Sequence, residues 1–153
     1  MNYSKVMSSK YLTNGLRNLK VTVPTAVVSG GNLTNGLRNL KVTVPTAVVS
    51  GGSCILECTY DLEGDLLYSV KWFRGKTEFY RFVPKEIPPT RTFASSGITV
   101  DLNNSTDTRV SIINMQRELS DYYRCEVVTD IPKFYTAVGS SYLVVVGKTC
   151  REN

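Results

Sequence analysis

The side chains that most often do chemistry in proteins are sparse in this chain. Its 153 residues include four Cys and one Trp but no His. Without His there is no imidazole to activate a nucleophile, to act as a base near neutral pH or to ligate a metal. No convincing nucleophile–base pair remains, so the sequence predicts a protein that is not an enzyme, with no catalytic residue, no cofactor and no resident metal.

Two groupings nevertheless have residue types found in metal sites. The carboxylates of Asp61, Glu63 and Asp65 share one short loop, which could bind Ca²⁺ weakly. A solvated acidic turn is the commoner outcome, and we prefer it. Cys54 and Cys58 are four residues apart but have no His partners, so a zinc site is not expected.

Cysteine oxidation is the chemistry that the spacing does predict. Cys58 precedes Trp72 by fourteen residues and Cys125 by sixty-seven, and Tyr123 stands two residues before Cys125. This is the pattern of the immunoglobulin core, where a disulfide joins two sheets, the Trp packs on it and the Tyr hydroxyl bonds to nearby backbone. We therefore predict a Cys58–Cys125 disulfide. Cys54 is expected to be a small buried hydrophobe, with a second disulfide to Cys150 as the alternative.

The elements that must position these residues are strands. After Ser53 the apolar residues alternate with polar ones between short turns, which is typical of an all-β sandwich. The span from Trp72 to Asn103 leaves room for extra strands, which favours an immunoglobulin-like β-sandwich of variable type. The predicted strands are Leu37–Val48 (kinked at Pro45), Cys54–Tyr60, Tyr68–Arg74, Glu78–Phe82, Ile98–Leu102, Arg109–Met115, Tyr122–Thr129 and Thr136–Val146. The residues expected to face the core beside the disulfide are Leu56, Val70, Trp72, Val110, Ile112, Met115 and Tyr123.

A repeat precedes this pattern. The segment LTNGLRNLKVTVPTAVVSGG occurs at 12–31 and again, letter for letter, at 33–52. Each copy contains an extended segment broken by a Pro, which indicates a sheet edge or a switch between sheets. Only one copy can pair along a given sheet edge, and the second copy leads directly into the next strand. We therefore expect 1–32 to be a disordered leader with a surplus copy, 33–147 to be the domain and 148–153 to be a tail.

The charge of the chain follows the same division. Residues 1–52 carry six Lys and Arg and no acidic residue, whereas 53–153 carry twelve basic and thirteen acidic residues. A basic leader without interleaved aromatics does not predict nucleic-acid binding. The longest late apolar stretch, Leu143–Val146, is too short to span a bilayer, so no membrane insertion is expected from this chain.

The segment YDLEGDLLYSVKWFRGKTEFYRFVPKE at Tyr60–Glu86, together with VPTAVVSGG before it and YYRCEV after it, resembles the beaten path proteins of insects. The resemblance covers roughly Leu37–Val146, which corresponds to the first immunoglobulin domain of that family. It implies a secreted or membrane-anchored neuronal recognition protein. It also implies a partner of the immunoglobulin superfamily on another cell, a sidestep-like receptor, and a role in axon guidance.

The expected location is extracellular, secreted or at the cell surface. A disulfide and the glycosylation sequons at Asn103 and Asn104 suit that route, although Met1–Lys20 has no apolar signal region. The alternatives are a truncated or misassembled fragment without independent function, and an immune or adhesion receptor domain of other specificity.

Alternation also predicts a partner-binding surface. Inward Trp72 and Cys125 turn their neighbours Phe73 and Arg124 outward, and exposed aromatics beside Arg are typical of interface hot spots. An alternative is that Phe79 or Phe82 fills the core. The residues predicted to bind the partner are Phe73, Phe79, Tyr80, Arg81, Arg124, Phe134 and Tyr135.

Overall fold

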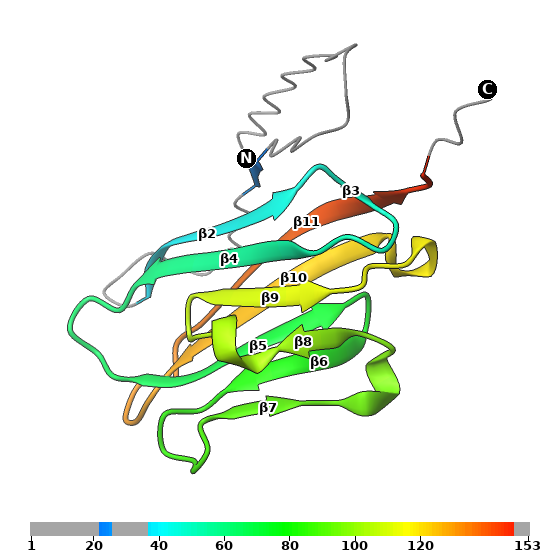
Figure 1. Ribbon diagram of the computed structural model, residues 1–153. Coiled ribbons are helices and arrows are strands. Elements are labelled where there is room, and N and C mark those ends of the chain that lie inside the picture. Colours follow the sequence, from blue (N-terminus) through cyan, green and yellow to red (C-terminus); the bar gives the residue numbers. More distant parts are fainter. Residues whose placement is uncertain (1–21, 26–36, 149–153) are drawn as a thin grey trace, which may run out of the picture.

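The alternating apolar residues form the strands of two packed sheets (Figure 1). The computed structural model of the chain describes residues 22–25 and 37–148, which contain eleven strands and three short 3₁₀ helices. The strands are β1 (Thr22–Thr25), β2 (Arg38–Pro45), β3 (Ala47–Val49), β4 (Cys54–Asp61), β5 (Leu67–Arg74), β6 (Thr77–Phe82), β7 (Thr90–Thr92), β8 (Thr99–Asp101), β9 (Arg109–Ile113), β10 (Asp121–Thr129) and β11 (Thr136–Val146). The helices are η1 (Ala94–Ser96), η2 (Leu102–Asn104) and η3 (Arg117–Leu119). The predicted all-β sandwich is confirmed.

Strand pairing gives each sheet a defined order. The five-stranded sheet runs β1-β2-β4-β9-β8 and the six-stranded sheet runs β3-β11-β10-β5-β6-β7. All neighbours are antiparallel except β3 and β11, which are parallel. Strands β1 and β7 were not predicted: β7 has only three residues, and β1 lies in the copy that was expected to be surplus.

Of the two outcomes that the Pro indicated, a sheet edge or a switch between sheets, the structure has the switch at Pro45. β2 belongs to the five-stranded sheet and ends at Pro45, and after one residue β3 joins the six-stranded sheet. Proline has no N–H to donate to a neighbouring strand. A proline at the end of a strand therefore favours the point where the chain leaves its sheet. A single extended segment of the second copy therefore serves both layers.

Four residues of the first copy, Thr22–Thr25, form β1 at the edge of the five-stranded sheet beside β2. The prediction gave this copy no strand. The rest of the predicted leader, and Cys150 in the predicted tail, lie outside the described residues. The division into leader, domain and tail thus stays a prediction.

The core between the sheets is built around the disulfide. Cys58 of β4 and Cys125 of β10 are bonded, and Trp72 lies directly across the ladder from Cys125. The Tyr123 hydroxyl donates to the Leu119 carbonyl at 2.7 Å, as predicted. A link that closes so long a loop contributes about 4 kcal/mol in the chain-entropy model. All seven residues predicted to line this core are fully buried: Leu56, Val70, Trp72, Val110, Ile112, Met115 and Tyr123.

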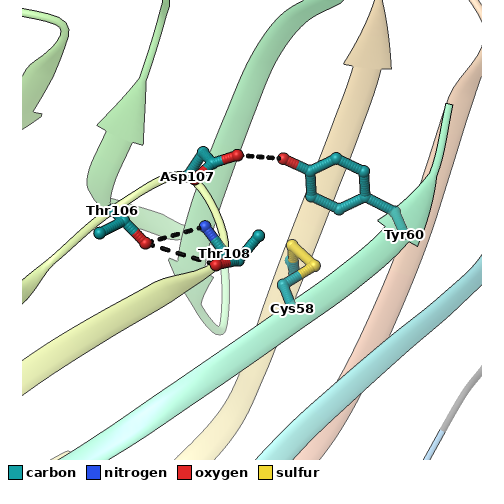
Figure 2. Close-up of a disulfide and its surroundings, with 6 residues drawn as sticks. Cys58, Tyr60, Thr106, Asp107 and Thr108 are labelled. Atoms are coloured by element: carbon teal, nitrogen blue, oxygen red, sulfur yellow. Dashed lines mark hydrogen bonds between the residues drawn. A yellow bond between two sulfur atoms is a disulfide. The ribbon is translucent and has the colours of Figure 1, made fainter.

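A turn on the β9 side closes one end of this core. Figure 2 shows the Tyr60 hydroxyl reaching Asp107, to which it donates at 3.0 Å, and the Thr108 amide donating to the Thr106 hydroxyl at 3.2 Å. The Cys58 amide donates to the Thr108 carbonyl at 2.8 Å. The turn at 106–108 is therefore tied to β4 beside the disulfide.

Two β-bulges in the six-stranded sheet change which residues face outward. Between β5 and β6, Trp72 pairs with Tyr80 and Phe73 pairs with Glu78, so Phe79 is an extra residue. Between β10 and β5, Val128 pairs with Ser69 and Thr129 pairs with Leu67, so Tyr68 is extra. An extra residue puts strict alternation out of phase from that point on. Sequence alternation alone therefore assigns the wrong face to some residues here.

Candidate binding face

The outer face of the six-stranded sheet is the side turned away from the core. Along β10 the side chains of Tyr123, Cys125 and Val127 are buried, and those between them are half-buried or exposed. The residues that this alternation and the strand register place on the outer face are Lys71, Phe73, Glu78, Arg81, Arg91, Tyr122, Arg124, Glu126, Val128, Tyr142 and Val144.

The centre of the outer face holds a cation–π pair. Arg124 of β10 and Phe73 of β5 are direct partners across the ladder, and the guanidinium carbon lies 4.4 Å from the ring centroid. A guanidinium in this position is attracted by the negative face of the ring. Both side chains are half-buried, so the pair presents a fixed, partly apolar surface to solvent. The predicted outward placement of Phe73 and Arg124 agrees with this geometry.

A second fixed cation lies on β6. The Arg81 guanidinium donates two hydrogen bonds to the Glu78 carboxylate, at 2.8 and 3.0 Å, and lies 5.5 Å from the centroid of the Phe93 ring. Residues three apart on a regular strand point to opposite faces, and the extra residue Phe79 is what places Glu78 and Arg81 on the same one. The hydrogen bonds to Glu78 raise the pKa of Arg81 above its ordinary value.

Three cations stand side by side across the neighbouring strands. Lys71, Arg81 and Arg91 are successive partners on β5, β6 and β7, and Glu126 of β10 lies opposite Lys71. Like charges directly opposite one another destabilise a sheet. Glu78 and Glu126 offset this row in part, and its outer edge stays basic.

Aromatic pairs mark both ends of the outer face. At one end Tyr122 of β10 and Tyr142 of β11 are ladder partners whose ring centroids lie 4.9 Å apart in an edge-to-face arrangement. Tyr122 is 59% exposed and Tyr142 is 46% exposed. At the other end the rings of Tyr68 and Phe134 meet edge to face at 5.8 Å.

The loops beside Phe134 are tied together by ion pairs. Lys133 of the β10–β11 loop bonds Asp65 of the β4–β5 loop at 3.2 Å, and Lys85 of the β6–β7 loop pairs with buried Asp130 at 2.5 Å. The bond from Lys85 and the Ile131 amide hold the pKa of Asp130 below its usual value. These contacts fix the loop that carries Phe134 and half-buried Tyr135.

The structure corrects two of the predicted binding residues. Phe79 and Tyr80 have no exposed area, so neither can contact a partner in this fold. The bulge at Phe79 turns both rings inward: Phe79 packs edge to face on Tyr123 at 5.8 Å, and the Tyr80 hydroxyl donates to the Thr106 carbonyl at 2.9 Å. The alternative that Phe79 fills the core is the correct one.

The three carboxylates of the acidic loop do not gather around a common site. Asp61 accepts a hydrogen bond from the Glu63 amide, Glu63 pairs with Arg38 at 3.7 Å, and Asp65 pairs with Lys133. Each carboxylate thus has its own partner. Among the described residues, no group of three His, Cys, Asp or Glu side chains is placed to hold a metal ion.

The remaining predicted residues lie away from the outer face. Cys54 is a buried free thiol, and burial raises its pKa to about 12. Asn103 and Asn104 are exposed in η2, between the two strands at the edge of the five-stranded sheet. Glycosylation there stays a prediction, and it would leave the outer face uncovered.

Sequence reasoning missed several outer-face residues. Strict alternation from inward Tyr123 places Tyr122 outward, and the same rule along the last strand finds Tyr142. Tyr68 could not be found, because its orientation depends on a bulge. Phe93 could not be found either, because it lies outside every predicted strand and joins the outer face only through its ring contact with Arg81.

Comparisons with known proteins identify the fold. The V domain of amphioxus IgVJ-C2 matches with 18% identity and a TM-score of 0.51, over 65% of this chain and 97% of that one. The two tandem V-type regions of VCBP3, a v-region-containing chitin binding protein, match with 14% identity and a TM-score of 0.55, over 76% of this chain and 48% of that one. A chain from the crystal structure of the mouse coronavirus receptor-binding domain complexed with its murine receptor matches with 14% identity and a TM-score of 0.55, over 71% of this chain and 54% of that one. No family model and no curated protein matches the chain.

The chain therefore has the fold of a variable-type immunoglobulin domain, as predicted. Its outer face carries the Arg124–Phe73 and Arg81–Phe93 contacts, with an aromatic pair at each end. No helix among the described residues is long and apolar enough to cross a bilayer.

Proposed function

We propose that this domain is an extracellular recognition module that binds a cell-surface receptor of the immunoglobulin superfamily through its outer face. The observation that carries the proposal is the Arg124–Phe73 pair at the centre of that face, with exposed rings at both ends. Arg, Tyr and Phe are enriched at the cores of protein interfaces, where rigid area costs little entropy on binding. The sandwich core uses none of these side chains.

The charges on the face support a particular kind of partner. The row of Lys71, Arg81 and Arg91 favours an acidic strip on the receptor, because complementary potentials steer encounter and suppress wrong partners. The resemblance to beaten path proteins supplies the class of receptor, a sidestep-like ectodomain, and a role in axon guidance. The Cys58–Cys125 disulfide suits the oxidising compartments through which such proteins pass.

The test is a binding screen of the full chain against sidestep-like ectodomains, followed by Arg124→Ala and Phe134→Ala. Truncating a hot-spot residue costs about 2 kcal/mol or more, so each variant should bind about thirtyfold more weakly. The matched controls are Arg109→Ala and Ile113→Ala on β9, whose exposed side chains belong to the other sheet.

Both controls should bind within about twofold of the parent chain, and all four variants should keep its melting transition. If a receptor is found but the β9 variants weaken binding while Arg124→Ala and Phe134→Ala do not, the binding surface lies on the five-stranded sheet. If no receptor binds, the sidestep-like partner class is wrong.

A further inference from the structure

The repeated segment has a structural property that recognition does not use. β2 and β3 together span 38–49, which lies entirely within the second copy at 33–52. Every residue of that copy has an identical residue twenty-one positions earlier. The first copy therefore offers the same side chains, in the same order, as the strands that the sandwich requires.

The place that β2 and β3 fill, here named the slot, is defined by side-chain packing. Leu40, Val42, Val44 and Val48 are buried in the core. A methyl group on Gly139 of β11 would lie 2.6 Å from Val42 Cγ2, so this glycine is what lets β2 approach. The first copy has the identical residues Leu19, Val21, Val23 and Val27.

The pairing of β1 with β2 is symmetric between the copies. Val23 pairs with Val44, which is its own counterpart, and Thr22 and Pro24 pair with Pro45 and Thr43. The antiparallel ladder is thus centred on equivalent residues. If the copies exchanged roles, with the first in the slot and the second at the edge, the same residue pairs would form.

We propose that either copy can fill the slot, so that the chain has two folded arrangements that differ in which copy packs against Gly139. When residues 17–28 occupy the slot, 32–52 becomes a connection between residues 31 and 53. Loop closure costs free energy that grows slowly with length, so this arrangement is the minor one. Because β3 pairs with β11, which carries Tyr142, either arrangement keeps the edge of the outer face paired.

The first test places a carboxylate in one copy at a time in the full chain. Val42 has no exposed area, and a buried unpaired carboxylate is strongly unfavourable. Val42→Asp should drive the first copy into the slot and lower the melting temperature only moderately. Val21→Asp should melt like the parent chain, and V21D/V42D, which has no intact copy, should melt far lower than either.

Hydrogen exchange read by mass spectrometry shows directly which copy occupies the slot, because the substitution makes the two otherwise identical peptides distinguishable. In V42D the two copies should exchange protection, so that the first copy gains the protection of β2 and the second falls to that of the edge strand β1. If V42D is as unstable as V21D/V42D, or if all three variants melt like the parent, the copies are not interchangeable.

A cross-link detects the minor arrangement without destabilising the fold. Ala47 pairs with Val144, and the counterpart of Ala47 in the first copy is Ala26. A47C/V144C should form a bond within one chain, and A26C/V144C should form the same bond in part, rising towards completion when V42D is added. No bond in A26C/V144C, or a bond between two molecules only, would overturn the proposal.

Discussion

The inner and outer faces of the six-stranded sheet are built from the same strands, but their side chains are held in different ways. The inner face packs on the disulfide and Trp72 and is sealed from water. The outer face is held by pairwise contacts, such as Arg124 on Phe73 and Arg81 on Glu78, that leave part of each side chain in solvent. The two bulges decide which residues belong to which face. Removing a side chain should therefore cost stability on one face and affinity on the other.

The largest effect is expected from the core. Trp72→Ala leaves a cavity opposite Cys125 and should lower the free energy of unfolding by about 3–5 kcal/mol. The neighbouring outer-face substitution Arg124→Ala should lower it by less than about 1 kcal/mol. Urea unfolding of both variants measures the difference, and equal losses would mean that the outer face also holds the sandwich together.

A smaller effect is expected at Gly139, where the absence of a side chain lets the two sheets approach each other. Gly139→Ala forces a methyl group against Val42 and should cost about 1–3 kcal/mol of stability through overpacking. The matched control is Gly64→Ala, whose added methyl group meets no atom within 4 Å but whose φ of +86° carries its own strain. Thermal melts should show a larger loss at Gly139, and a larger loss at Gly64 would contradict this account of the close approach.

The smallest of these effects concerns Tyr80 and alkaline pH. Burial, with the nearby charge of Asp107, raises the pKa of Tyr80 to about 12, and burial also raises the pKa values of Tyr60 and Tyr123. Because these pKa values exceed that of an unfolded tyrosine, about 10, stability is full below pH 10 and falls as the pH rises towards them.

Tyr80→Phe should remove one late step from the phenolate absorbance titration. It should also cost about 1–2 kcal/mol at neutral pH, because the Thr106 carbonyl loses its donor. If the step that the variant lacks lies instead near pH 10, Tyr80 ionises like an exposed phenol.

The features of the fold that could be predicted from the sequence are those fixed by burial in the core. The Cys58–Cys125 bond, inward Trp72 and the Tyr123 hydrogen bond follow from spacing, because two facing sheets admit few ways to fill the space between them. Met115 is buried three residues after Ile112, and the left-handed backbone at Asn114 marks the change of phase between them. The missing N–H of Pro45 indicated a sheet edge or a switch between sheets, and the structure has the switch.

The positions of the β-bulges, where the alternation of inward and outward side chains changes phase, could not be predicted from the sequence. The run EFYRF has apolar or aromatic residues at consecutive positions, so nothing in it shows that Phe79 is the extra residue or that Tyr80 turns inward with it. Tyr68 sits in a similar run. The second copy was expected in the domain because it leads directly into the next strand, but nothing in the sequence indicated that four residues of the first copy pair with β2.

The most direct test of the division between the two faces is a matched pair on the strands β5 and β6. Phe73→Ala and Phe79→Ala remove the same ring from the outer and the inner face. Unfolding in urea and affinity for a receptor found in the screen should be measured for both. Phe73→Ala should bind about thirtyfold more weakly with nearly unchanged stability, whereas Phe79→Ala should lose about 3–5 kcal/mol of stability while its folded fraction binds like the parent. A Phe79→Ala variant that stays stable but loses binding, or a Phe73→Ala variant that binds normally but unfolds readily, would contradict the account.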